Sequence, residues 1–130
     1  MSQPRDHISK ARESLGAGRH LLSGGFTNPA GREAYMAAFH AALAIIQSRT
    51  GRQPKTHNGT HTEFARLSRS EPSIQASMVA FLSRAYEFKS LADYMFEAPM
   101  TPAQAQSALD EAEQFVAAVC ALLAVPETGG

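Results

Sequence analysis

The sequence predicts an all-α protein, built as an antiparallel four-helix bundle with one additional short helix. Apolar residues recur at three- and four-residue steps in every periodic segment, and no stretch alternates long enough to indicate a strand. Glycines and prolines separate these segments. The connections between them are about four to eight residues long, which is typical of antiparallel neighbouring helices.

The first two predicted helices lie before residue 52. One covers Asp6–Leu22, is weakened by two internal glycines, and ends at Ser23–Gly25. The other begins at Asn28, whose side chain can accept hydrogen bonds from the N–H groups of the first turn. Pro29 then stands at a first-turn position where its missing N–H is not needed. Gly51 closes this second helix. Its expected apolar side consists of Tyr35, Ala38, Phe39, Ala42, Ile45 and Ile46.

A loop and two further helices follow. The loop covers residues 51–56, because Gln53 precedes a proline and is therefore biased away from helix. A short helix is expected over Gly59–Arg69, burying a phenylalanine and a leucine. Pro72 opens the longest helix, which Glu97–Pro99 breaks. Its apolar stripe is Ile74, Met78, Phe81, Leu82, Ala85, Phe88, Leu91, Ala92 and Met95.

The last predicted helix carries the clearest start signal. Thr101 stands three residues before Gln104, which is a capping box, and Pro102 occupies the first helical position. Its apolar stripe is Ala105, Ala108, Leu109, Ala112, Phe115, Val116, Val119, Leu122 and Leu123.

Length and composition predict one globular domain over residues 1–130, with a core at about 28–124 and a frayed tail at 125–130. The chain is 44% hydrophobic and 18% charged, which places it outside the disordered class. Its single cysteine, Cys120, excludes a disulfide framework and a multi-cysteine zinc site. Without a signal-peptide pattern or a bilayer-length apolar run, we expect a cytoplasmic protein with no membrane contact.

The net charge of zero hides an asymmetry between the two halves of the chain. Residues 1–70 carry ten Lys and Arg against four Asp and Glu, whereas residues 71–130 carry two against eight. Three explanations are open: the halves pair with each other, the chain docks a partner of complementary charge, or a basic face receives phosphate. Ordinary solvated helix faces are a fourth.

A basic window over Arg49–Arg69 is the first candidate site. It holds five Lys and Arg against one acid, Glu63. Loop cations that lead into a helix N-terminus can hold a phosphate, because backbone N–H groups and the helix dipole favour anions there. We therefore take Arg52, Lys55 and His57 as candidate nucleotide- or RNA-binding residues. The alternative is a solvated loop with capping residues.

Other reactive side chains in the sequence have structural interpretations. His57 and His61 are four residues apart, but no Asp or Cys is near to complete a zinc site, so no metal and no cofactor is expected. His40 is expected to be a core histidine bonded to a carbonyl or a hydroxyl. Cys120, within an apolar stripe, is expected to be an inert packing thiol.

A second candidate cluster lies near the end of the longest helix. Lys89 and Asp93 are four residues apart and can pair, and Tyr94 adds a hydroxyl donor. The structural alternative is a salt-bridged helix end, which contributes only a few tenths of a kcal/mol.

Four segments, in the same order, resemble the HEPN domain family of bacteria and archaea. Ala34–Ala42 resembles the family's AYYAMFHAA helix, and Pro54–Gly59 its PKTHxG entry into the third helix. Ser83–Tyr94 is similar to the block that ends in ADY, and Ala108–Val119 to the closing helix with its AExFV pattern. Together they cover residues from about 30 to 120.

The resemblance implies an all-α bundle that often dimerises and is often encoded beside, or fused to, a minimal nucleotidyltransferase in toxin–antitoxin pairs. Some members of the family are metal-independent ribonucleases whose active pair is an arginine followed a few residues later by a histidine, brought together across the dimer. In that pair the histidine exchanges protons and the arginine stabilises charge on phosphorus.

This chain departs from that pattern at the expected place. Lys89 stands where the arginine would be, and Asp93-Tyr94 stand where the histidine would fall. Lysine lacks the bidentate fork for phosphate, and tyrosine accepts protons poorly at neutral pH. Arg52 and His57 match the Arg–His spacing, but in a loop, and about one such match is expected by chance.

The leading hypothesis is a homodimeric HEPN-type binding module for a nucleotide or RNA, or for a nucleotidyltransferase partner, as a toxin–antitoxin component. Its candidate binding residues are Arg52, Lys55, His57, Lys89, Asp93 and Tyr94, and no catalytic residue is assigned. One alternative is a divergent metal-independent endoribonuclease that uses Arg52/His57 or Lys89/Tyr94. A second is a structural protein that self-associates through its charge asymmetry.

Overall fold

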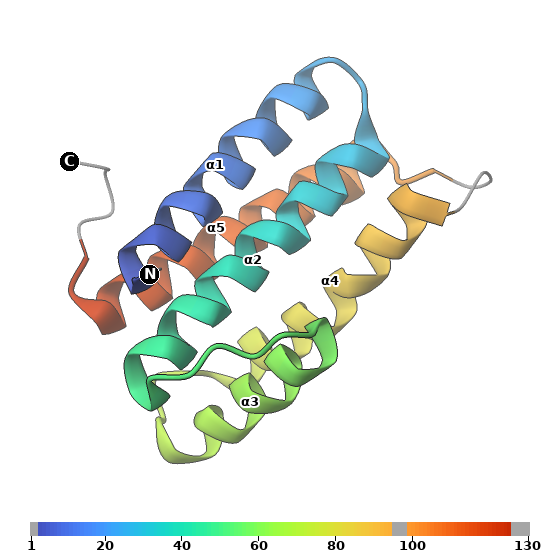
Figure 1. The fold of residues 1–130 in the computed structure, drawn as a ribbon. Coiled ribbons are helices and arrows are strands. Elements are labelled where there is room, and N and C mark those ends of the chain that lie inside the picture. Colours follow the sequence, from blue (N-terminus) through green and yellow to red (C-terminus); the bar gives the residue numbers. More distant parts are fainter. Residues whose placement is uncertain (1–2, 95–98, 126–130) are drawn as a thin grey trace.

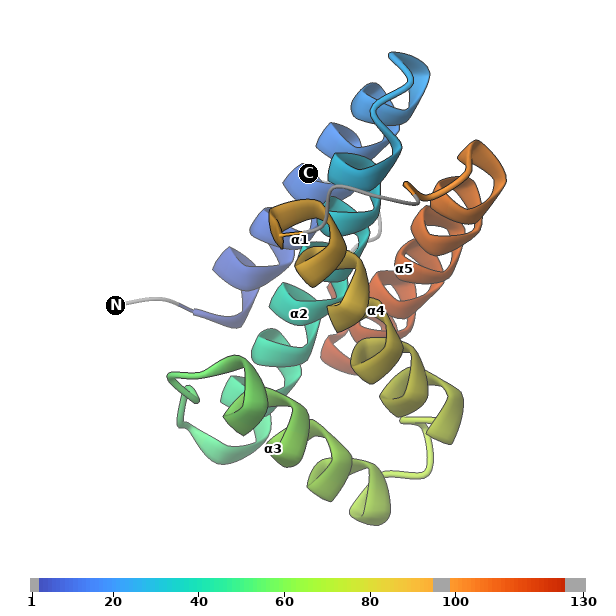
Figure 2. The same cartoon turned by 90° about the vertical axis from the view of Figure 1, so that its right-hand side faces the viewer.

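The computed structural model describes residues 3–94 and 99–125, which form five α-helices and no strand. Helix α1 lies beside α2 and α5, while α4 packs mainly against α2 and α3 crosses one end of the bundle (Figures 1 and 2). This confirms the predicted all-α bundle with its short additional helix. The bounds are Pro4–Ser23 for α1, Thr27–Thr50 for α2, His57–Ser70 for α3, Ala76–Tyr94 for α4 and Pro102–Leu123 for α5.

Helix α2 is the centre of the fold, because it contacts all four other helices. A helix that is covered on most sides needs small residues wherever its neighbours approach closely. Residue Gly31 shows this need: a Cβ atom there would collide with the sulfur of Met100 and touch Phe88. Seven alanines of α2 are completely buried, namely Ala30, Ala34, Ala37, Ala38, Ala41, Ala42 and Ala44.

The start of α2 differs from its sequence prediction. The residue at the N-cap is Phe26, which offers no side-chain cap, and Asn28 lies within the first turn. The Asn28 Oδ1 atom instead accepts a hydrogen bond of 2.8 Å from the backbone N–H of Met100. The prediction that Asn28 caps α2 is therefore wrong, since its carboxamide ties α2 to the segment before α5.

The start of α4 also differs from the prediction. The helix begins at Ala76 instead of Pro72, because residues after α3 form a turn in which the N–H of Ile74 donates to the carbonyl of Glu71. Ile74 is buried, so the turn still contributes to the core. The expected break at Glu97–Pro99 lies largely outside the described residues, as does Met95.

The predicted helix ends at Gly51 and at the start of α5 are confirmed. Gly51 adopts the left-handed conformation with φ of 72°, which suits a residue without a Cβ atom. The side chains of Thr101 and Gln104 form the reciprocal capping box, with Pro102 at the first helical position. Of the expected frayed tail at 125–130, residues 126–130 lie outside the described residues, and the N–H of Val125 donates to the carbonyl of Cys120.

Ion pairs between the two halves of the chain account for part of the charge asymmetry. Three arginines of the basic half form ion pairs with acids of the acidic half. Most of these side chains are at least a quarter exposed, so each pair contributes little stability. The first of the open explanations, pairing between the halves, is thus realised within one chain. The pairs are Arg19–Asp110, Arg19–Glu113, Arg32–Asp93 and Arg49–Glu71.

Candidate functional site

The buried hydroxyl of Tyr35 joins two histidines. Its Oη atom lies 2.7 Å from Nδ1 of His57 and 2.9 Å from Nε2 of His61. Tyr35 comes from α2 and is completely buried, while both histidines come from the first turns of α3. The side chain of Thr56 caps α3 by accepting from the N–H of Gly59, which keeps that glycine helical. Helix α3 begins at His57, two residues before the predicted start at Gly59, so both histidines lie on one face of it.

Hydrogen counting constrains the protons of this triad. Burial, followed by the nearby Tyr86, raises the pKa of Tyr35 far above its usual value, so its hydroxyl stays protonated and has one hydrogen to donate. One imidazole nitrogen accepts that hydrogen. The facing nitrogen of the other imidazole must then carry a hydrogen and donate it to Oη. The tautomers of His57 and His61 are therefore linked through Tyr35.

Aromatic rings surround His57. Its ring centroid lies 4.4 Å from that of Phe39, 5.4 Å from that of Tyr86 and 5.6 Å from that of Tyr35. His61 meets the same Tyr86 ring edge-on at 5.4 Å. We call these five residues the aromatic cluster. Tyr86, on α4, is 37% exposed, so one face of the cluster reaches solvent.

Both histidines of the cluster have pKa values below the usual one. For His57 the largest cause is burial, followed by the positive charges of Lys89 and Arg32. For His61 the causes are burial and the neighbouring His57. Two imidazoles that are neutral at pH 7 can both accept and donate hydrogen bonds, which is the state required for proton exchange with a ligand.

Two cations lie beside His57 and share one acid. The Nζ atom of Lys89 lies 2.7 Å from Oδ2 of Asp93, and Nε of Arg32 lies 3.2 Å from Oδ1 of the same carboxylate. The hydrogen bond from Lys89, with the charges of both cations, lowers the pKa of Asp93. The predicted Lys89–Asp93 pair is confirmed. The side chain of Tyr94, the last residue of α4, lies outside what the structure describes.

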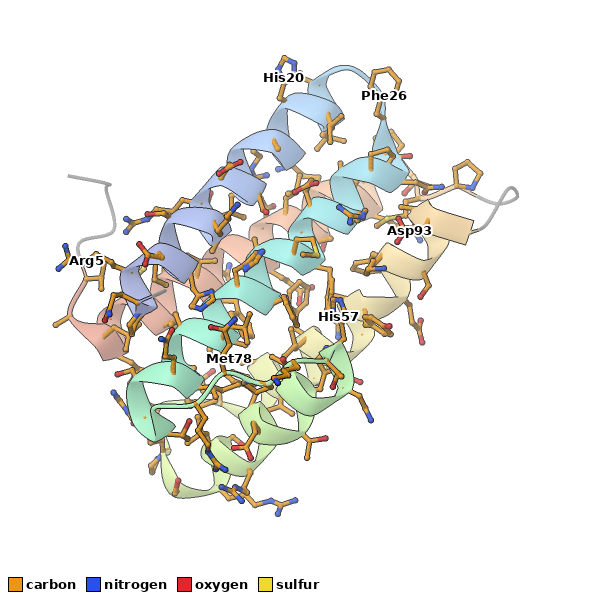
Figure 3. The ribbon with its side chains drawn as sticks, viewed as in Figure 1. Arg5, His20, Phe26, His57, Met78 and Asp93 are labelled. Atoms are coloured by element: carbon orange, nitrogen blue, oxygen red, sulfur yellow. The ribbon has the colours of Figure 1, made fainter. Side chains whose placement is uncertain are left out.

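Figure 3 shows how these residues lie on the fold. His57 stands at the start of α3 between α2 and α4, and Asp93 lies farther along, near the end of α4. Arg5 lies on the far side of the molecule, on α1. The charges of Lys89 and Arg32 lie close enough to His57 to lower its pKa, after the effect of burial. The predicted loop histidine and the predicted α4 cluster therefore lie near each other.

The remaining loop candidates face two different grooves. Arg52 and Lys55 line a groove of about 510 Å³ over α2 and α3 that His57 does not line. Lys55 also lines a second groove of about 620 Å³, which His57 shares. The structure therefore brings Lys55 and His57 to one groove, whereas Arg52 lines the first groove. The pairing of Arg52 with His57 that spacing allowed gains no geometric support.

His40 lies in the second groove and differs from its prediction. Its ring is partly buried, and its Nδ1 atom is buried with no hydrogen-bond partner among the described residues. The expected bond to a carbonyl or hydroxyl is absent at that atom. The ring stacks on that of His7, with 6.2 Å between the ring centroids. Burial, then the nearby His7, lowers the pKa of His40 to about 4. His7 in turn lies 3.2 Å from Oε1 of Gln53.

Other expected properties concern metals, membranes and the cysteine. Over residues 3–94 and 99–125, no group of three or more His, Cys, Asp or Glu side chains is arranged to hold a metal ion. None of the described helices combines the length and apolar character needed to cross a bilayer. Cys120 is buried as predicted, but Nη2 of Arg12 lies 3.6 Å from its sulfur, a contact that only the fold creates.

Sequence reasoning missed Tyr35, Phe39, Tyr86 and Arg32 as members of the site. Tyr35 and Phe39 are four residues apart on α2, a spacing that is typical of the core face of a helix. His61 was weighed only as a metal ligand. The available signal was that Tyr35 and His57 both stand within the motifs that carry the family resemblance.

Comparison with known proteins agrees with that resemblance. A family model described as HEPN domain matches residues 4–122, which is most of the chain. A relative from Methanocaldococcus jannaschii, named "Putative toxin MJ0605", is 31% identical over 109 residues. The match covers 84% of this chain and 80% of the relative.

Proposed function

This chain belongs to the HEPN domain family, and we propose that it is a toxin-type HEPN module that binds RNA at the aromatic cluster. The observation that carries the proposal is the position of neutral His57 among aromatic rings, with Lys89 and Arg32 beside it. The relative's name as a toxin supports the toxin-related part of the proposal.

The chemistry of the site matches the two parts of a nucleotide. Lys89 and the planar guanidinium of Arg32 suit phosphate oxygens, the latter in a bidentate manner. The exposed face of Tyr86 and the adjacent imidazole of His57 offer surfaces on which an unpaired base can stack. A site with both components favours single-stranded RNA over an isolated inorganic anion.

Asp93 sets the strength of this binding. Its carboxylate already holds both cations, at 2.7 Å and 3.2 Å, so an incoming phosphate must compete with it. We therefore expect modest affinity that falls steeply with salt, as charge-dominated binding does.

Binding of a fluorescein-labelled single-stranded RNA, followed by anisotropy at low salt, tests the proposal. Lys89→Gln and Arg32→Gln should each weaken binding about tenfold and lower its salt dependence. Arg5→Gln is the matched control, because Arg5 is exposed on the far side of the molecule (Figure 3). Equal affinities for the wild type and both site variants would refute binding at this site.

A metal-independent endoribonuclease is the second candidate, favoured by the linked pair of neutral histidines. A neutral His57 can take the proton of a ribose 2′-hydroxyl, whose oxygen then attacks phosphorus and expels the 5′-oxygen. The leaving 5′-oxygen takes up the proton that His57 received, which Tyr35 can relay to the second imidazole on the same helix face. Lys89 and Arg32 stabilise charge on phosphorus.

Incubation of the purified protein with total RNA in EDTA separates the two candidates. Cleavage by the wild type that is lost in His57→Ala establishes the ribonuclease. Loss in Tyr94→Phe assigns a role to the Lys89/Tyr94 pair, whereas loss in Arg52→Gln assigns one to the Arg52/His57 pair. Absence of cleavage by the wild type, together with RNA binding, supports the binding module alone.

The proposal extends to protein partners. A toxin-type module is expected to associate with an antitoxin, and the family resemblance points to a minimal nucleotidyltransferase.

We also propose that the chain forms a homodimer, and light scattering tests this by measuring the native mass. A mass that falls to one chain in 1 M salt would favour self-association through charge, the structural alternative. Retention of two chains at that salt supports an apolar dimer interface.

A further inference from the structure

A second groove adjoins the proposed RNA site, because Phe39 and His57 of the aromatic cluster also line the groove. Its walls come from α1 and α2 and from the loop that connects α2 to α3, and its volume is about 620 Å³. That volume lies within the range of small-molecule sites in proteins. We call it the His40 groove; its lining is His7, Phe39, His40, Leu43, Gln53, Pro54, Lys55, Thr56 and His57.

The lining of the His40 groove suits a flat aromatic ligand with negative charge nearby. The Phe39 and His40 rings meet edge-on at 5.7 Å, and the His7 and His40 rings are stacked. Lys55 is exposed at the rim, and no acid is among the lining residues. The Nδ1 atom of His40 is buried without a partner among the described residues.

The groove is aligned with the cation pair along α2. Arg32, Tyr35, Phe39 and Leu43 follow at three- and four-residue steps and so share one face of that helix. The stripe is about 16 Å long at 1.5 Å per residue. The stripe is therefore longer than the spacing of about 3.4 Å between successive stacked nucleotides of a strand, so it can extend past more than one nucleotide. His57 packs over the middle of the stripe, against Tyr35 and Phe39.

We propose that the His40 groove binds the base of the neighbouring nucleotide in an RNA strand whose phosphate lies at Lys89 and Arg32. The ligand is thus at least a dinucleotide, and it passes over His57. The inference rests on the proposed RNA-binding function and adds a second base subsite to it. Charge complementarity and the aromatic lining favour this occupant over an acidic peptide, which would gain from Lys55 but not from the rings.

The affinity of adenylyl-3′,5′-adenosine relative to adenosine 5′-monophosphate, measured by calorimetry, tests the subsite. We expect the wild type to bind the dinucleotide about tenfold more tightly, because stacking of a second base contributes on that scale. Lys55→Gln should remove most of this advantage while mononucleotide affinity stays within about threefold of the wild type. Phe39→Leu should weaken the binding of both ligands, because Phe39 lines the groove and also packs on His57. Lys55 is exposed, so its replacement tests the groove without disturbing the core.

The matched control is Phe26→Leu, since Phe26 is an exposed aromatic residue at the turn between α1 and α2 (Figure 3). If the mononucleotide binds and the dinucleotide binds no more tightly, the second base subsite is refuted and the proposed function remains. Failure of both ligands and of RNA to bind would overturn the proposed function itself. Displacement of the dinucleotide by a glutamate-rich peptide at equal concentration would also refute the subsite, in favour of an acidic protein partner.

Discussion

The two sides of α2 are built from different kinds of residue. Toward α1 and α5 the contacts are small and apolar: a Cβ at Gly18 would collide with Leu109 and press on the backbone of Ala30. Toward α3 and α4 the same helix presents Arg32, which pairs with Asp93, and Tyr35, whose hydroxyl bonds two histidines. One side provides stability through close packing, whereas the other keeps polar groups that a purely stabilising core would not contain.

The largest effect is expected from a truncation on the close-packed side. Leu109 is completely buried, so Leu109→Ala should lower the free energy of unfolding by about 2–5 kcal/mol. Urea denaturation measures this change, with the partly buried Leu122→Ala as the milder control. RNA affinity of the folded variant should stay unchanged. A loss of affinity in folded Leu109→Ala would show that the two sides of α2 are coupled.

A smaller effect is expected on the polar side. Tyr35→Phe leaves the packing intact but removes the hydroxyl between His57 and His61, which should cost about 1–3 kcal/mol of stability. Tyr86→Phe, at an exposed ring, should cost less than about 0.5 kcal/mol. The nitrogen chemical shifts of both imidazoles should change in Tyr35→Phe and stay at their wild-type values in Tyr86→Phe. Unchanged shifts in Tyr35→Phe would contradict the tautomer link.

The pH dependence of stability should reveal the half-buried His40. Its folded pKa of about 4 lies below its unfolded value near 6.5, so the unfolded chain binds more protons between these values. The contribution is thus fully present above pH 6.5 and is lost as the pH falls toward 4. After allowance for solvent screening of the partly exposed ring, we expect about 1–2 kcal/mol.

Urea denaturation of His40→Gln at several pH values measures this contribution. The variant should have a flatter stability curve between pH 6.5 and 4 than the wild type. His20→Gln, on an exposed residue of α1, is the control and should follow the wild-type curve. Parallel curves for His40→Gln and the wild type would assign the acid sensitivity to other groups.

The smallest effect is expected from the acid that neutralises the site. Asp93→Asn removes the carboxylate that holds Lys89 and Arg32, so RNA affinity at low salt should rise about threefold. Asp110→Asn, which removes one of the two acids that pair with Arg19 on another face, should leave affinity unchanged. The comparison is made by anisotropy titration. Weaker binding in Asp93→Asn would mean that Asp93 orients the cations for the ligand instead of competing with it.

Local signals predicted most of the fold. The capping box of Thr101 and Gln104 and the left-handed Gly51 were correct because each depends on residues within one turn. Asn28 failed as a cap because its carboxamide had a more distant partner, the N–H of Met100, which spacing cannot reveal. Pro72 failed as a helix start because Ile74 packs into the core from a turn.

The candidate site was predicted only in fragments. His57 and Lys89 were named separately, from a basic loop and from a helix end, and their nearness is a property of how α3 meets α4 and α2. Arg52 was grouped with His57 because they are close in sequence, yet the loop directs it to a different groove. Tyr35 was taken as core, which it is, but its hydroxyl is also the centre of the histidine pair.

By itself the sequence determined the helices, their apolar stripes and the all-α class, because these follow from periodicity and from capping within a few residues. Its motifs also indicated the family. Only the tertiary structure decided which polar groups meet, since hydrogen bonds and ion pairs depend on atoms a few ångströms apart that belong to different helices. The meeting of Tyr35, His57 and Lys89 is fixed by the packing of α3 and α4 against α2.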